Sequence, residues 1–289
     1  MNVQMPRPAV ETSTPARQWI AHLDLRFASN GHRTELRHCA HKGPLRVQRL
    51  FHPDGNKTAH CYLLHPPGGV VLGDELSINA DVKSGNALLT STSAARFYGT
   101  GSFEQPQRQT IRLSVDQGTL QWLPQETILF PGANAELTTH VEFGDSAALY
   151  FWDIVVLGLP ACGERFDCGR LRQTLSCLRS GRPVLKERLS INAGDSTTQH
   201  EIGLGGRSTL GTLVTTHRLE RAERERWLSR VAPLDPAGEF SITEKSGLLI
   251  ARYRGDDAQR CRAGFADLWR TTTKISAGLQ VSEPRIWHT

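Results

Sequence analysis

Residues 111–122 read IRLSVDQGTLQW, and their alternation decides the fold class. Ile111, Leu113 and Val115 are apolar at every second position, which is the pattern of a strand with one buried face. The turn formers Asp-Gln-Gly follow, and the same alternation then resumes. The stretch therefore predicts two short strands joined by a tight turn.

The same format recurs over much of the chain. KSGN at residues 83–86 precedes ALLT, PGAN at 131–134 precedes AELTTHVEF, and GDS at 144–146 precedes AALYFWDIVVLGL. Turn signals fall about every 8 to 14 residues, a spacing typical of all-β folds. The interval from about residue 20 to 191 therefore predicts a sandwich, a barrel or an irregular solenoid of strands.

Two helices are predicted near the end of the chain. Residues 219–231 are rich in good helix formers and stop before Pro233, and residues 256–274 carry apolar side chains at helical spacing. One more strand region separates them. We expect a single large, mainly β domain over residues 19–289, whose small C-terminal part carries about two helices, after a flexible tail at residues 1–18.

Composition excludes several classes of protein. Of the 289 residues, 38% are hydrophobic and 22% are charged, as in ordinary globular proteins. The longest apolar run, residues 154–159, is too short to span a bilayer, so no membrane association is expected. Because the N-terminus lacks the apolar region of a signal peptide, the sequence predicts a cytoplasmic location.

Charge and cysteine content narrow the choice further. The net charge of +5 would suit an acidic partner, but the chain has no block of Lys and Arg of the kind that binds nucleic acid, and we expect none to bind. Six cysteines without a CxxC pair predict reduced, mostly buried thiols. We find no nucleophile elbow, HExxH or Walker motif, and GLGGRS at 203–208 lacks the P-loop lysine.

Asp74 is the first of four acids that stand out. It follows YLLHPPGGVVLG at residues 62–73, where two prolines and several glycines force tight turns between apolar segments. An acid at such a bend is either a turn residue that bonds its own backbone or a carboxylate that faces an internal polar space. Local sequence alone favours the first interpretation.

The other three acids lie within apolar strands. Asp153 interrupts LYFWDIVVLGL, where it must be paired, hydrated or neutral, and an arginine partner is the plain structural explanation. Alternation in VLKERLSI places Glu187 on the apolar face with Leu185 and Leu189. Glu126 in LPQETILF alternates in the same way, although a strand edge also explains it.

Seven segments in order resemble the urease accessory protein family UreD, called UreH in some organisms. The resemblance covers nearly all of the chain from Trp19 onward. The segments are GPLRVQRLFHP (43–53), CYLLHPPGGVVLGDEL (61–76), ARFYGT (95–100), LQWLPQETILFPGANAEL (120–137), WDIVVLGLPACGE (152–164), KERL (186–189) and PRIWHT (284–289).

The resemblance implies a flattened helical winding of strands and a non-enzymatic scaffold. It further implies binding to UreF, through it to the GTPase UreG, and to the urease apoprotein UreABC. The resemblance also implies that nickel(II) binds only transiently as it crosses an internal tunnel, with no tightly bound cofactor. The position of Asp74 is associated with that tunnel, and we rank Asp74 and Glu187 ahead of Asp153 and Glu126 as transit carboxylates.

The chain departs from the family pattern in two places. Leu72 replaces the first glycine of a pair before Asp74, and ARFYGT lacks the usual basic residue after Tyr98. Two His/Cys clusters are weaker candidates for metal contact, because their spacing is not diagnostic. They are His38, Cys39 and His41, and His60, Cys61 and His65.

Among the tryptophans, Trp122, Trp152 and Trp269 are expected in the core. Trp287, beside Arg285, is the better partner-binding candidate, since Trp and Arg are typical interface anchors; a docked chain terminus would also explain it.

Two other functions stay open from the residues alone. A hydrolase would use two carboxylates from Asp74, Glu75 and Glu187, and a plain β-rich interaction scaffold would never handle metal.

Overall fold

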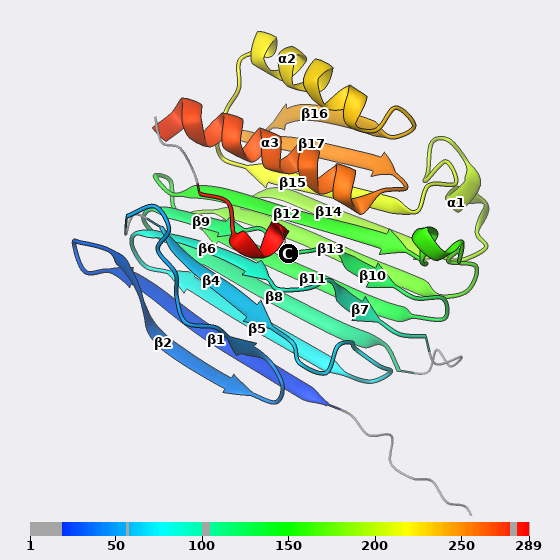
Figure 1. Cartoon of the computed structure of the whole chain (residues 1–289), viewed down its shortest axis with the longest axis horizontal. Coiled ribbons are helices and arrows are strands. Elements are labelled where there is room, and N and C mark those ends of the chain that lie inside the picture. The colour runs from blue at the N-terminus through cyan, green and yellow to red at the C-terminus, as the bar shows by residue number, and fades with distance from the viewer. Residues whose placement is uncertain (1–18, 56–57, 100–104, 278–281, 289) are drawn as a thin grey trace, which may run out of the picture.

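The computed structural model describes residues 19–288 except 56–57, 100–104 and 278–281. The expected tail at 1–18 lies outside the described residues. Two β-sheets form the body of the molecule, and two helices near the C-terminus pack at one end of it (Figure 1). The mainly β fold predicted from alternation is confirmed.

The first sheet has seven strands in the order β14-β13-β11-β8-β5-β1-β2. Its strands are β1 (Ile20–Ser29), β2 (Thr34–Lys42), β5 (Glu75–Val82), β8 (Gln107–Val115), β11 (Asn134–Phe143), β13 (Arg170–Arg179) and β14 (Arg182–Asn192).

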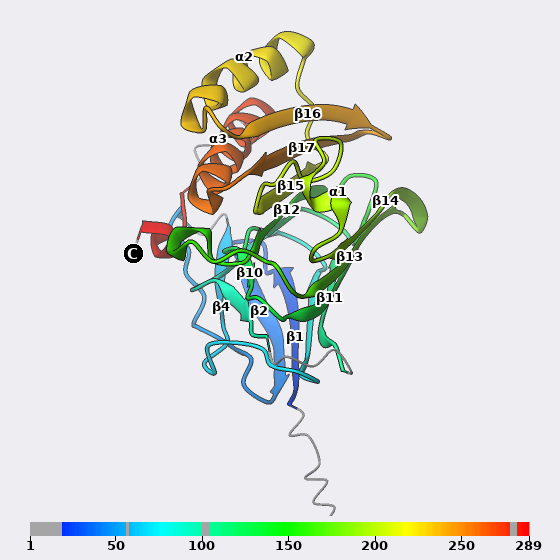
Figure 2. The same ribbon diagram turned by 90° about the vertical axis from the view of Figure 1, so that its right-hand side faces the viewer.

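The second sheet has ten strands, eight of them in the order β16-β17-β15-β12-β9-β6-β4-β3. These are β3 (Arg46–Val47), β4 (Ala59–Leu64), β6 (Asn86–Ser91), β9 (Thr119–Trp122), β12 (Ala148–Leu157), β15 (Thr209–Thr215), β16 (Glu239–Lys245) and β17 (Leu248–Gly255), while β7 (Ala95–Phe97) and β10 (Thr127–Leu129) attach beside β12. Figure 2 shows the two sheets as separate layers.

The chain winds between the two sheets as a flattened helix. Strands β5, β8, β11 and β13 lie parallel in the first sheet, while β6, β9 and β12, which alternate with them along the chain, lie parallel in the second. Each strand therefore pairs with the strand one coil away, as the family resemblance implied.

Turns of successive coils stack on one another. Gly118, in the turn of the IRLSVDQGTLQW stretch, has φ +100°, and a Cβ built on it would lie 1.9 Å from the carbonyl oxygen of Gly85 in the preceding coil. Thr119 N donates to that same oxygen at 2.9 Å. Only glycine fits where two backbones approach this closely.

Alternation gives the first sheet an inner apolar face and an outer polar face. Inward side chains such as Leu23, Ile78 and Val141 are buried in the core between the sheets. On the outer face a row of alternating charges crosses four strands through ion pairs of 3.0 to 3.5 Å, and its members are Glu75, Arg108, Glu136 and Arg172. The two faces are thus chemically distinct.

The C-terminal part extends the second sheet and covers it with helices. Strands β15, β17 and β16 are antiparallel, and α2 (Arg221–Val231) and α3 (Ala258–Ala277) pack over them. Trp152, Trp227 and Trp269 are buried in a second core cluster there. Both helices lie close to the predicted ranges. The short helices are α1 (Ser196–Gln199), η1 (Pro160–Cys162), η2 (Ala232–Leu234) and η3 (Arg285–His288).

The prediction of mostly buried cysteines is wrong for half of them. Cys61, Cys177 and Cys261 are buried, whereas Cys39, Cys162 and Cys168 are exposed because they lie on the edge strand β2, in the short helix η1 and in a loop. Among the described residues, no helix combines the length and apolar character that crossing a membrane requires.

Candidate functional site

Two cavities lie between the sheets and share part of their walls. An open cleft of about 820 Å³ lies between β13 and β14 on one side and β15, β16 and β17 on the other. A smaller inner cavity of about 100 Å³ continues between the sheets toward His65 and Gly68. Phe151 and Asp153 line both cavities, so β12 forms the boundary between them.

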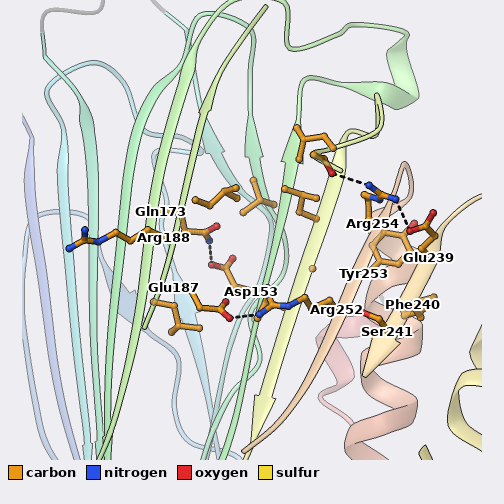
Figure 3. A pocket seen from close by; sticks show the side chains of 18 of the residues that line it. Asp153, Gln173, Glu187, Arg188, Glu239, Phe240, Ser241, Arg252, Tyr253 and Arg254 are labelled. Atoms are coloured by element: carbon orange, nitrogen blue, oxygen red, sulfur yellow. Dashed lines mark hydrogen bonds and ion pairs between the residues drawn. The ribbon is translucent and has the colours of Figure 1, made fainter. Parts of the chain in front are cut away.

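Asp153 is the interior carboxylate at this boundary. It occupies an inward position of β12 between Phe151 and Val155, both buried in the core. The Gln173 side-chain amide, from β13 in the opposite sheet, donates a hydrogen bond to Asp153 Oδ2 (Figure 3). Burial raises the pKa of Asp153 to about 6, although the amide opposes the shift. An amide partner therefore takes the place of the arginine considered from sequence.

Glu187 lines the open cleft. It lies on β14 between Leu185 and Leu189 on the inward face, as alternation predicted, and it is ion-paired with Arg252 of β17 in the opposite sheet (Figure 3). Arg252 also donates to Thr212 Oγ1 at 3.2 Å. The pair bridges the two layers at the cleft.

Asp74 is buried but is already bonded to its own turn. Its Oδ1 accepts a hydrogen bond from Trp19 N and its Oδ2 one from Val71 N, each at 3.0 Å. Asp74 is not among the residues that line the cleft or the inner cavity. It reaches the inner cavity only through the electrostatic field at His65, whose pKa is lowered by burial and raised again in part by Asp74.

Glu126 lies beside the inner cavity without lining it. Its Oε2 forms an ion pair with Nη1 of Arg262 from α3 at 3.0 Å, and its neighbour Gln125 contributes to the cavity wall. The contact ties α3 to the body at the start of β10. A structural role explains Glu126 as it stands.

The carboxylates proposed for a hydrolase do not converge. Glu75 lies on the outer face of the first sheet, 3.2 Å from Arg108, whereas Glu187 lies on the inner face. Asp74 is engaged by two backbone donors. The arrangement therefore offers no acid and base pair directed at one substrate position.

The two His/Cys clusters do not form metal sites in the described part of the chain. His38, Cys39 and His41 lie on the exposed edge strand β2. His60 is buried, its Nδ1 has no hydrogen-bond partner, and burial lowers its pKa to about 4. No group of three or more His, Cys, Asp or Glu side chains among the described residues could enclose a metal ion.

The C-terminal segment is docked on the second core cluster. The Trp287 ring centroid lies 5.2 Å from that of Trp152 and 5.6 Å from that of Trp269, and Trp287 Nε1 donates to Thr90 Oγ1 at 3.1 Å. Trp122, Trp152 and Trp269 are buried, as expected. Arg285 remains exposed beside them.

Sequence reasoning missed Gln173 and Arg252. In RLRQTLSCLR, alternation places Gln173 on the inward face with Leu171 and Leu175, and the rule that located Glu187 would have located it too. Arg252 lies on one face of β17 with Leu248 and Ile250, but no local signal indicates its pairing with Glu187, which is 65 positions away.

The fold is a two-sheet winding of strands, and separated carboxylates line its interior cavities without forming, among the described residues, a group of three that could enclose a metal ion. Comparison with known proteins identifies the class to which such a chain belongs. The UreD urease accessory protein family matches residues 20–288. The chain belongs to this family, whose members are accessory proteins and not enzymes.

Individual relatives match over almost their whole length. The urease accessory protein UreD of Saccharophagus degradans is 39% identical over 295 residues, covering 100% of both chains. That of Pseudomonas fluorescens Pf-5 is 41% identical over 274 residues, covering 94% of this chain and 95% of the relative. That of Dechloromonas aromatica is 38% identical with the same coverage.

Proposed function

We propose that this protein assists the nickel loading of urease by giving Ni²⁺ a passage between its two sheets. The observation that carries the proposal is the position of Asp153, whose side chain lines both the open cleft and the inner cavity. An ion that moves from one cavity to the other passes this carboxylate. Nickel is the passenger in this scheme and not a resident cofactor.

The chemistry of the lining suits transient binding. Ni²⁺ accepts carboxylate, imidazole and water ligands, and Glu187, Asp153 and His65 supply the first two along the cavities. Because these groups are separated, each holds a hydrated ion weakly enough to release it. Conduction requires several favourable but escapable positions, as in ion channels.

Two of the four sequence candidates, Glu187 and Asp153, line the cavities, whereas Asp74 and Glu126 do not. Glu187 receives the ion at the open cleft, Asp153 passes it at the boundary, and His65 meets it in the inner cavity. Asp74 acts beyond His65, either on the ion directly or by holding the turn that shapes this end. Glu126, next to a cavity-lining residue, is the outermost candidate.

The partners follow from family membership. We propose that the outer surfaces bind UreF, through it the GTPase UreG, and the urease apoprotein UreABC in the cytoplasm. Arg285 is exposed and stands beside the docked Trp287, so this segment is our candidate for a partner contact. GTP hydrolysis would belong to the partner, since the chain has no phosphate-binding motif.

Coexpression with the urease genes tests the proposal. Asp153→Asn and Glu187→Gln, separately and together, should lower the nickel content of purified urease while complexes with the partners still form. Glu142→Gln removes the same charge from an exposed outer-face position of β11 and serves as the matched control. If urease purified with the double variant has its full nickel content, the passage of nickel is wrong and only a scaffold role for the protein remains.

A further inference from the structure

Ionic pairing makes the cleft nearly neutral before any metal arrives. Glu187 is paired with Arg252, and Glu239 is paired with Arg254 at 2.8 Å. Arg188 also contributes to the lining, but its side chain extends away from Asp153 (Figure 3). Glu187, the carboxylate proposed to receive a metal cation, is therefore already paired with the guanidinium of Arg252.

The two paired arginines differ in how firmly they are held. Arg254 donates to the backbone oxygens of Glu201 and Gly203 as well as to Glu239, which fixes it to a loop. Among the residues that the structure describes, Arg252 donates only to Glu187 and to the Thr212 hydroxyl. Its side chain is 43% exposed, against 29% for Glu187. Arg252 thus lies on the solvent side of the pair with few other anchors.

We propose that Arg252 is a displaceable internal cation that holds Glu187 until a divalent metal ion takes its place. This inference rests on the proposed passage of nickel. A partly exposed ion pair is weak, and a doubly charged ion at the same carboxylate gains more Coulomb energy than a guanidinium. Arg252 can leave toward solvent without abandoning a buried partner.

The exchange would set the selectivity of the cleft. Without Arg252, the Glu187 carboxylate would stand free and attract any cation, including abundant monovalent ions. With Arg252 in place, an entering ion must compensate for the free energy lost when the Glu187–Arg252 pair breaks. This requirement favours divalent ions over monovalent ones. When the ion moves on to Asp153, Arg252 returns to Glu187 and opposes backward movement.

Equilibrium dialysis with nickel sulfate on the purified full chain, kept with its partner where it needs one to remain folded, measures the effect. Arg252→Gln should raise the apparent affinity for Ni²⁺ about two- to fivefold, the size of a partly exposed ion-pair contribution whose competition is removed. Adding Glu187→Gln should abolish that gain. Arg172→Gln, which removes an exposed ion-paired arginine from the outer face, is the matched control and should leave the affinity unchanged.

A second measurement uses the unaltered chain. Phenylglyoxal modifies accessible arginines, and mass spectrometry reads the modified positions. Nickel should increase the modification of Arg252 and leave Arg254 unchanged, because only Arg252 is released. This readout does not depend on how well the Arg252→Gln variant folds.

The outcomes separate the two claims. The proposed exchange is wrong if Arg252→Gln binds nickel no better than the unaltered chain, or if the gain in affinity persists when Glu187→Gln is added. It is also wrong if nickel leaves the modification of Arg252 by phenylglyoxal unchanged. The passage itself would survive as long as Asp153→Asn and Glu187→Gln reduce the nickel content of urease. If those two variants load urease fully, the proposed function fails first.

Discussion

The side-chain amide of Gln173 donates a hydrogen bond to Asp153 across the space between the two sheets. The two residues come from β13 and β12, which succeed each other along the chain but lie in different layers. The bond gives a neutral partner to a carboxylate that occupies an inward position of β12, between the buried side chains of Phe151 and Val155. A neutral partner leaves much of the cost of burying the charge uncompensated.

Asp153→Asn should therefore stabilise the protein at neutral and alkaline pH. The folded-state pKa of about 6 lies above the ordinary value of 3.8, so the folded chain binds more protons between these values and its stability falls as pH rises through them. The full penalty above pH 6 is about 3 kcal/mol. Chemical denaturation of the variant should show this gain at pH 8 and little gain near pH 4.

Glu142→Gln on the outer face is the control for that measurement. It should change stability by less than about 0.5 kcal/mol at both pH values, since the side chain is exposed. An Asp153→Asn gain of equal size at pH 4 and pH 8 would contradict the assignment of the penalty to ionisation.

Asp74→Ala should destabilise the fold by about 1 to 3 kcal/mol. The substitution leaves the backbone N–H groups of Trp19 and Val71 without their acceptor. Asp145, an exposed acid in the turn before β12, offers a control, because its replacement by Ala removes the same charge from a carboxylate that accepts no such backbone bond within the described part of the chain. Thermal unfolding of both variants makes the comparison.

The nickel content of urease from cells that carry the Asp74→Ala variant then distinguishes a structural role of Asp74 from a role in nickel transit. We expect reduced loading together with reduced stability. Unchanged stability with lost loading would instead mean that the carboxylate acts on the ion and that its turn bonds contribute little.

Glu126 and Arg262 should show a coupling free energy of about 1 kcal/mol in a double-mutant cycle. Both side chains are largely shielded, at 22% and 19% exposed, and their 3.0 Å contact joins α3 to the body. Glu126→Gln, Arg262→Gln and the double variant, unfolded in denaturant, give the cycle. Additive effects would contradict a stabilising contribution from this contact.

Trp287→Ala and Arg285→Ala should separate docking of the C-terminal segment from partner binding. The first loses two ring contacts and the bond to Thr90, and it should lower the free energy of unfolding by about 2 kcal/mol. The second removes an exposed side chain and should change it by less than about 0.5 kcal/mol.

Copurification of the Trp287→Ala and Arg285→Ala variants with the partners measures whether this segment contributes to binding. Arg285→Ala should weaken recovery of the complex although the protein remains stable. Normal recovery from both variants would exclude this segment as an interface and leave Trp287 as core packing.

Local sequence predicted the features that depend on residues close to one another in the chain. Alternation gave the strands and the inward direction of Glu187, and helical spacing gave α2 and α3 to within a few residues. Features that depend on distant pairing were hidden. Asp74 is bonded by the N–H of Trp19, 55 positions earlier, and no local pattern encodes that contact.

The same limit explains the cleft. Glu187 and Arg252 meet because β14 and β17 belong to different sheets and line the same cleft from opposite sides, a consequence of the whole winding. The family resemblance supplied that winding, whereas composition and periodicity left sandwich, barrel and solenoid equally open.

The stacked coils have a consequence for how such a protein can vary. Because successive residues of a strand point to opposite faces, the wall of the inner cavity and the outer surface are formed by alternate residues of the same strands. Substitutions during evolution can therefore change the outer surface while the cavity wall stays as it is, or change the cavity wall while the outer surface is kept.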